Sequence, residues 1–257
     1  MKKRLSRIGI TLGVAAFWIG VWWLVSWRMG NPLLLPDPTT VIKLLCDMMQ
    51  TAEFYLITAI SLGNVLSGIV VAVILGVLLA ILTSHVRILR ELLLPLMTVI
   101  KATPIASFII LALIWMGSGR LPSFITVLIV LPVVWTNLDI GFSKIDPQLR
   151  EVATVYGFSF GKRLRLLILP SLRPYFVSSV RTSLGLAWKA GIAAEIIAMP
   201  RGTIGTMIGE AKLYIEYDKM FAWTLTVILL SLMIELAFTA LIDRFDRGLR
   251  IGEEVTV

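Results

Sequence analysis

Residues 57–83 read ITAISLGNVLSGIVVAVILGVLLAILT, and none of these residues carries a charge. A helix of about 20 apolar residues is long enough to cross the hydrocarbon core of a bilayer. Backbone groups in lipid must find their hydrogen bonds within the protein, and this run is too long for a barrel strand. The stretch therefore predicts a membrane-spanning helix.

Comparable runs recur along the chain. Of its 257 residues, 58% are apolar and 16% are charged, compared with about 45–50% and about 25% in soluble domains. Its mean hydropathy is +0.90. We predict an all-α integral membrane protein with a single transmembrane domain over residues 1–257, in which the first run is a retained span and not a cleaved signal. The six expected spans lie near 8–27, 57–83, 92–116, 121–141, 174–199 and 220–242.

The basic residues between these runs predict the orientation, because cytoplasmic segments are enriched in Lys and Arg. With the N-terminus inside, the inner segments hold fifteen Lys and Arg residues and the outer segments hold six. Both termini are therefore expected in the cytoplasm. The net charge of +8 is explained by this topology, so we expect no nucleic-acid partner.

The composition excludes several chemistries. One cysteine, Cys46, and one histidine, His85, cannot form a disulfide framework or a Cys/His metal cluster. A phosphate-binding loop needs four residues between its glycines and Ser or Thr after its lysine. Gly157 and Gly161 are separated by three residues, and an arginine follows Lys162. We expect no catalytic residues, no metal and no ATPase site in this chain.

Two of the outer segments contain more than a plain loop. Residues 39–49 have the apolar spacing of a short interfacial helix, and they follow a proline-rich turn. In residues 201–219, Gly205 and Gly209 have the GxxxG spacing that marks close helix contact, but the surrounding sequence is not an apolar 20-residue run. We expect a glycine-rich re-entrant or surface turn there, with close helix packing as the alternative.

The longest inner connection, residues 142–173, contains clear helix signals. Asp146 followed by Pro147 is typical of a helix start, and Gly157 is typical of a helix end. Between them, one apolar face is predicted from Leu149, Val152, Ala153 and Tyr156. Ser159 predicts the start of a second short helix that ends at Leu169 and Pro170. We expect a bent pair of short amphipathic helices at the membrane surface.

The spacing within this connection matches a known motif. Importer permeases of the ATP-binding-cassette (ABC) superfamily carry an EAA motif, which reads EAA, three residues, Gly, nine residues, I-x-L-P. This chain resembles them through Glu151, Val152, Ala153, Gly157, Leu167, Ile168, Leu169 and Pro170. It departs from the pattern at two positions, where Val152 replaces an alanine and Leu167 replaces an isoleucine.

The resemblance implies an ABC importer permease in which residues 142–173 dock in a cleft of a cytoplasmic ATPase dimer. It further implies that ATP and Mg²⁺ bind to that ATPase, that a second permease copy completes the pathway, and that an extracytoplasmic solute-binding protein delivers cargo. The implied location is a bacterial inner or plasma membrane. Residues 35–38, 101–117 and 187–195 resemble the nitrate, sulfonate and taurine branch, which implies a small anionic or zwitterionic solute.

Charges inside the predicted spans are costly and are functional candidates by default. Trp188 and Glu195 lie seven residues apart on one helix face, and Lys189 lies about 100° around from Trp188. One interpretation places these three residues along a solute pathway whose positive charge attracts an anion. The alternative is a structural ion pair of Lys189 with Asp139, Glu195 or Glu235.

Two other functions fit a chain of this composition. An ion-coupled secondary transporter would use the buried charges as coupling sites, and a membrane scaffold would transport nothing. Six spans without an evident inverted repeat, together with a motif that a secondary transporter does not need, favour the ABC permease. A scaffold would leave the charges in the fifth span without a role.

Overall fold

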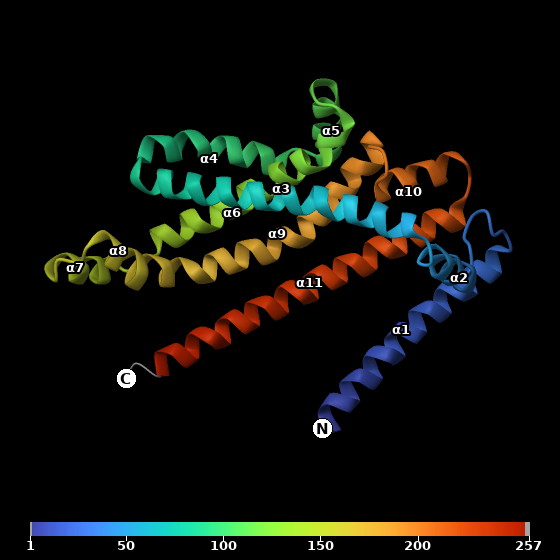
Figure 1. Ribbon diagram of the computed structural model, residues 1–257, viewed down its shortest axis with the longest axis horizontal. Helices are drawn as coiled ribbons and strands as arrows, with labels where there is room; N and C mark the ends of the chain where they lie inside the picture. Colours follow the sequence, from blue (N-terminus) through green and yellow to red (C-terminus); the bar gives the residue numbers. More distant parts are fainter. Residues whose placement is uncertain (1, 255–257) are drawn as a thin grey trace.

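The computed structural model describes residues 2–254, and every regular element in that range is a helix (Figure 1). The elements, in chain order, are α1 (Lys2–Met29), α2 (Pro38–Met48), α3 (Ala52–His85), α4 (Arg87–Ala102), α5 (Ile105–Trp115), a 3₁₀ turn (Ser118–Arg120), α6 (Leu121–Ser143), α7 (Pro147–Val155), α8 (Phe160–Arg163), a π turn (Leu164–Ile168), α9 (Leu169–Ala198), α10 (Ile204–Leu213) and α11 (Tyr217–Glu254).

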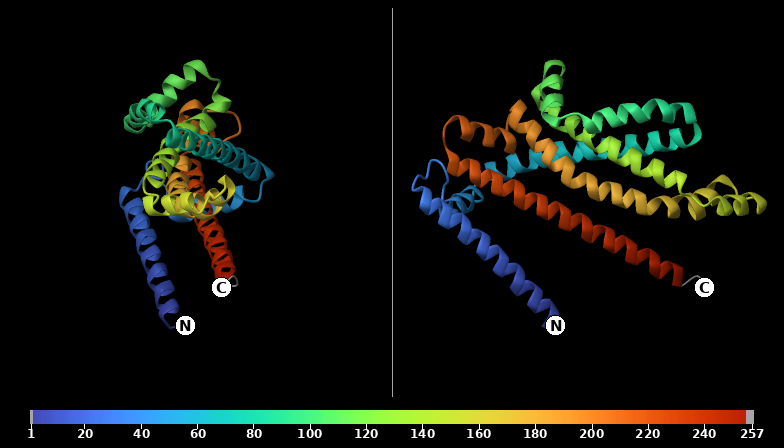
Figure 2. Two further views of the ribbon diagram at one scale, coloured as in Figure 1. Left: turned by 90° about the vertical axis from the view of Figure 1, so that its left-hand side faces the viewer. Right: turned by 180° about the vertical axis from the view of Figure 1, so that it is seen from behind.

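Three long helices form the centre of the molecule, where α6 packs against both α3 and α9. The approach of α3 to α6 is close because two glycines lie at the contact. A Cβ atom on Gly68 would be 2.6 Å from the Ser123 carbonyl oxygen, and one on Gly76 would be 2.8 Å from Val134 Cγ1. In Figure 2, α1 and α11 extend away from this centre. Small residues thus bring the helices together where lipid gives little hydrophobic driving force.

The predicted spans all fall on helices, with differences in length and continuity. Among the described residues, three helices are long and apolar enough to cross a membrane, namely Ala52–His85, Ser118–Ser143 and Tyr217–Ile242, or four if a bent pair counts as one span. The helix α1 contains the predicted span 8–27, and α9 covers the predicted span 174–199 as far as Ala198, but neither is among these three. The structure thus supports three or four spans by this criterion, and the total of six stays a prediction.

The predicted span 92–116 is not one continuous helix, as the proline at position 104 leads one to expect. It divides into α4 and α5, which are inclined at 105° to one another. The break lies at Pro104, because proline disfavours the helical conformation for the residue before it. Thr103 accordingly has φ −78° and ψ 134°, an extended conformation. By contrast, α4 and α6 continue through Pro95 and Pro132.

The short helix predicted over 39–49 is confirmed as α2. Asp37 is its N-cap, and its Oδ1 accepts hydrogen bonds from the backbone N–H groups of Thr39 and Thr40 at 2.9 and 3.0 Å. Hydrogen bonds from the side chain of Thr39 and from Thr40 lower the pKa of Asp37 to about 2. The cap therefore stays ionised at neutral pH and fixes where the helix begins.

We expected a glycine-rich re-entrant or surface turn over residues 201–219. The segment instead contains the helix α10. Ile204, Gly205 and Gly209 are buried. A Cβ on Gly205 would lie 2.3 Å from Glu195 Cβ, so α10 rests directly on α9. The alternative interpretation of the GxxxG spacing, close helix contact, is the one that the structure supports.

Candidate functional site

The bend between α7 and α8 is formed as the sequence predicts. Asp146 caps α7, with its Oδ1 2.8 Å from the Gln148 N–H. At the other end, Gly157 has φ +60° and donates to the Thr154 carbonyl at 3.0 Å, while Phe158 donates to the Ala153 carbonyl at 2.9 Å. These two bonds define a Schellman motif, for which glycine is the favoured residue.

Ala153 and Leu167 of the motif hold the two halves of the bend together. Both are buried, and they pack with Ile145 in a small apolar cluster that Phe142 and Phe158 cover. The small side chain of Ala153 lets the second half of the bend lie against the first. These two motif positions therefore have a structural role in the segment.

The predicted apolar face of α7 is mostly uncovered. Ala153 is buried, but Leu149, Val152 and Tyr156 are 50%, 46% and 75% exposed. Val155 and Phe160 beside them are 83% and 77% exposed. The bend thus presents an apolar surface, defined by Val152, Val155, Tyr156 and Phe160, at one end of the molecule (Figure 1). Glu151 is exposed next to it. Exposed apolar surface of this kind is typical of an interaction site.

The second short helix does not end at Leu169 and Pro170, which corrects the sequence interpretation. It passes through the π turn into α9, so that residues 160–198 form one continuous helix. In the π turn, the Leu169 N–H donates to the Leu164 carbonyl five residues back. Because this turn has a longer hydrogen-bonded ring than an α-helix, the helix can continue through Pro170, which has no backbone N–H to donate. Leu169 and Pro170 are both exposed.

The three pathway candidates of α9 do not gather around one cavity. Trp188 is buried, and its Nε1 donates to the Val227 carbonyl of α11 at 3.0 Å. Glu195 is fully buried, whereas Lys189 is exposed on the surface of the single chain. Among the described residues Lys189 forms no ion pair, and Asp139 pairs with Arg90 instead. A pathway role for these residues stays a prediction.

Glu195 is satisfied entirely by neutral donors. Ser61 Oγ donates to its Oε2 at 2.8 Å, Asn64 Nδ2 to its Oε1 at 3.3 Å, and the Gly205 N–H to its Oε2 at 3.2 Å. Ser61 Oγ also accepts from the Ile204 N–H at 2.9 Å. This network joins α3, α9 and the first turn of α10, where a carboxylate is well placed for the helix dipole.

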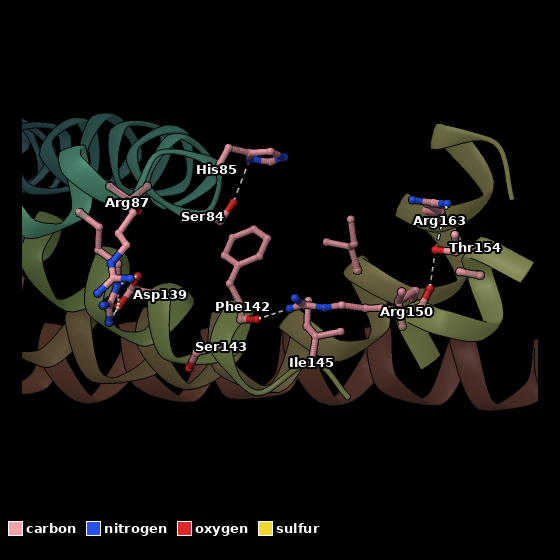
Figure 3. Close-up of a pocket in the computed structure, with 15 residues that line it drawn as sticks. Ser84, His85, Arg87, Asp139, Phe142, Ser143, Ile145, Arg150, Thr154 and Arg163 are labelled. Carbon is pink, nitrogen blue, oxygen red and sulfur yellow. Dashed lines mark hydrogen bonds and ion pairs between the residues drawn. The ribbon is translucent and has the colours of Figure 1, made fainter. Parts of the chain in front are cut away.

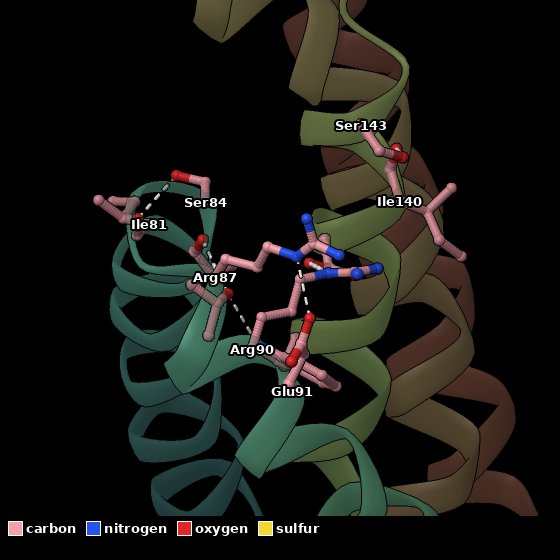
Figure 4. A network of polar contacts seen from close by, with 11 residues as sticks. Ile81, Ser84, Arg87, Arg90, Glu91, Ile140 and Ser143 are labelled. Carbon is pink, nitrogen blue, oxygen red and sulfur yellow. Dashed lines mark hydrogen bonds and ion pairs between the residues drawn. The ribbon is translucent and has the colours of Figure 1, made fainter.

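The sequence did not predict the bidentate ion pair between Arg90 of α4 and Asp139 of α6. Arg90 Nε and Nη2 each lie 2.8 Å from an Asp139 carboxylate oxygen, and Figure 4 shows Arg90 next to Arg87 and Glu91 at the start of α4. The two residues are 49 positions apart, so no spacing rule connects them. The only signal was the cost of an unpaired aspartate inside a predicted span.

Comparison with known proteins identifies the class. Residues 68–251 match the family described as "Binding-protein-dependent transport system inner membrane component", and the chain belongs to this family. The resemblance to ABC importer permeases is thereby confirmed. Such a permease is a transport subunit in a membrane.

Named relatives agree with the taurine and sulfonate branch. The chain is 27% identical to the taurine transport system permease protein TauC of Escherichia coli (strain K12), over 92% of this chain and 89% of the relative. It is 28% identical to a probable ABC transporter permease protein of Brucella abortus (strain 2308), over 99% of both chains. It is 25% identical to the putative aliphatic sulfonates transport permease protein SsuC of Bacillus subtilis (strain 168), over 78% of this chain and 73% of the relative.

Proposed function

We propose that this chain forms the solute pathway of an ATP-driven importer and couples that pathway to a separate cytoplasmic ATPase dimer through the α7–α8 bend. The observation that carries the proposal is the exposed apolar surface of Val152, Val155, Tyr156 and Phe160, held in a fixed orientation by the Gly157 turn. Such a surface has no reason to face water unless a partner covers it. ATP and Mg²⁺ bind to the partner, so this chain is not itself an enzyme.

The remaining parts of the proposal follow from the family. A second copy of the permease completes the pathway, and an extracytoplasmic binding protein delivers the solute. The names of TauC and SsuC favour a small anionic or zwitterionic sulfonate. The proposed location is the inner or plasma membrane of a bacterium.

Uptake in proteoliposomes tests this function. We expect labelled taurine or a short alkanesulfonate to accumulate when the permease is reconstituted with its companion ATPase and binding protein and ATP is enclosed. Accumulation should stop when ATP is replaced by a non-hydrolysable analogue, which is the matched control. Uptake by the permease alone, driven by a sodium or proton gradient, would contradict the proposal and favour a secondary transporter.

We also propose six spans with both termini in the cytoplasm, and cysteine labelling tests this topology. In a Cys46→Ser background, a membrane-impermeant maleimide added to intact spheroplasts should label Tyr214→Cys and leave Ser159→Cys unlabelled. Both positions are exposed in the structure, so the protein itself does not shield either cysteine from the maleimide. Permeabilised cells provide the control, since both variants should then react. Labelling of Ser159→Cys from outside would reverse the orientation.

A further inference from the structure

A basic cavity lies beside the α7–α8 bend. It has a volume of about 590 Å³ and opens between the α3–α4 turn, the end of α6 and the α7–α8 bend (Figure 3). Its size is within the range of small-molecule sites, about 300–1,000 Å³. Four of the residues that line it are arginines: Arg87, Arg90, Arg150 and Arg163. The positive-inside rule places the whole region on the cytoplasmic side.

The positive charge of the cavity is only partly compensated. Among the described residues that line the cavity, Asp139 is the one with a carboxylate. It forms a bidentate ion pair with Arg90. Arg87 forms an exposed ion pair with Glu91, which is outside the lining. Exposed pairs of this kind are weak and easily exchanged. Among the side chains that the structure describes, no carboxylate pairs with Arg150 or Arg163.

The hydrogen bonds of these last two arginines leave donors unused. Arg150 Nη2 donates to the Phe142 carbonyl at 2.8 Å, and Arg163 Nη2 reaches Thr154 Oγ1 only at 3.4 Å. Arg163 Nε is buried and has no hydrogen-bond partner in the described part of the chain. A buried N–H of a charged group without an acceptor is costly. A ligand that accepts from it would remove that cost.

We propose that this cavity binds a phosphate group, held chiefly by Arg150 and Arg163 with Arg87 at the rim. Guanidinium groups match phosphate oxygens with pairs of parallel hydrogen bonds, and three arginines in the lining of one cavity favour a multivalent oxyanion over a single carboxylate. The phosphate can belong to an anionic lipid headgroup, for which basic pockets at the cytoplasmic face are typical sites, or to a free cytoplasmic anion. The site stands independently of the proposed transport function.

Such a ligand would connect elements that otherwise touch little. Arg150 comes from α7, Arg163 from α8 and Arg87 from the first turn of α4. A phosphate bound by all three would fix the α7–α8 bend against the α3–α4 turn. The orientation of the exposed apolar surface would then depend on whether the cavity is occupied.

Binding to the purified full-length chain in a neutral detergent tests the proposal. The probes are inorganic phosphate at constant ionic strength, dioctanoyl phosphatidylglycerol, and dioctanoyl phosphatidylcholine as the lipid without net charge. Protection against thermal unfolding, followed over probe concentration, gives an apparent Kd for each. We expect phosphatidylglycerol, inorganic phosphate or both to protect, and phosphatidylcholine to protect far less. Protection by the lipid alone identifies a headgroup site, and protection by both identifies a site for phosphate itself.

Substitutions show whether that binding occurs in the cavity. Arg163→Gln should weaken binding by about tenfold or more, because it removes a charged donor, and Arg150→Gln should do the same. Arg165→Gln is the matched control, since Arg165 lies on the same segment but does not line the cavity. Arg163→Gln breaks only the 3.4 Å contact, so its unfolding temperature without probe should match that of the wild type.

Three results would overturn the proposal. In the first, neither probe protects the wild type. In the second, Arg165→Gln weakens binding as much as Arg163→Gln, which would indicate general charge attraction. In the third, no probe binds but Arg163→Gln weakens association with the ATPase, which would assign these arginines to a protein partner.

Discussion

Replacing Gly157 with valine should reduce transport by at least about tenfold while leaving the protein in the membrane. Gly157 has φ +60°, and a Cβ there would meet nothing within 4 Å. The Cβ itself therefore meets open space, and the main cost of the substitution is conformational. A left-handed conformation costs an L-residue about 1–2 kcal/mol, and more for a β-branched one. The bend should relax to another geometry and carry Tyr156 and Phe160 away from their positions.

The measurements are uptake, ATPase stimulation by the binding protein, and membrane abundance. We expect uptake to fall by at least about tenfold, a loss that 1.4 kcal/mol suffices to produce, with abundance nearly unchanged. Gly161→Val is the matched control, because Gly161 also has open space around it but lacks a positive φ. Gly157→Asn should retain part of the activity, since asparagine tolerates the left-handed region. Normal coupled transport by Gly157→Val would remove the support for a coupling role of this bend.

Replacing Gly205 with alanine should prevent stable folding. The added Cβ would lie 2.3 Å from Glu195 Cβ and 2.6 Å from the Ile196 backbone nitrogen. Backbone atoms of α9 cannot yield as a flexible side chain can, so α10 must move away. That shift would also break the Gly205 N–H bond to Glu195 and leave a buried carboxylate short of a donor. Overpacking costs about 1–3 kcal/mol, and the lost hydrogen bond adds to it.

Membrane abundance and the temperature of unfolding in detergent measure this effect. Gly209→Ala provides the control on the same helix face. There the nearest atom is Met199 Cε at 3.3 Å, the end of a flexible side chain. We expect Gly205→Ala to reduce both quantities strongly and Gly209→Ala to change them little. Equal behaviour of the two variants would mean that the contact of α10 with α9 does not determine stability.

Local signals in the sequence predicted local structure well. Asp146 and Pro147 begin α7, Gly157 ends it, and Asp37 caps α2. Each of these depends on residues within a few positions of one another, where capping and backbone preference act directly. The long helices could be predicted from the apolar runs, because a backbone in lipid must form its hydrogen bonds within the segment.

The sequence predictions failed where the structure depends on contacts between residues that are far apart in the chain. Pro104 interrupts the helical pattern of the predicted span 92–116 in the sequence, but the angle of 105° between α4 and α5 could not be predicted from it. The π turn was missed because a proline in sequence reads as a helix end, although a change in hydrogen-bond register accommodates it. No spacing indicates that Arg90 meets Asp139, or that Glu195 takes its donors from Ser61 and Gly205. These contacts depend on how helices that are far apart in the sequence pack against one another.

The continuity of residues 160–198 through the π turn has a mechanical consequence. At 1.5 Å per residue, this helix is about 58 Å long, and it joins Phe160 of the exposed apolar surface to Glu195 beneath α10. No loop interrupts it, so a movement at one end can be passed along the backbone to the other. For a rod of that length, a tilt of about 10° about one end displaces the other by about 10 Å. A tilt about the α8 end would therefore displace most strongly the region of Glu195, where α9 meets α3 and α10.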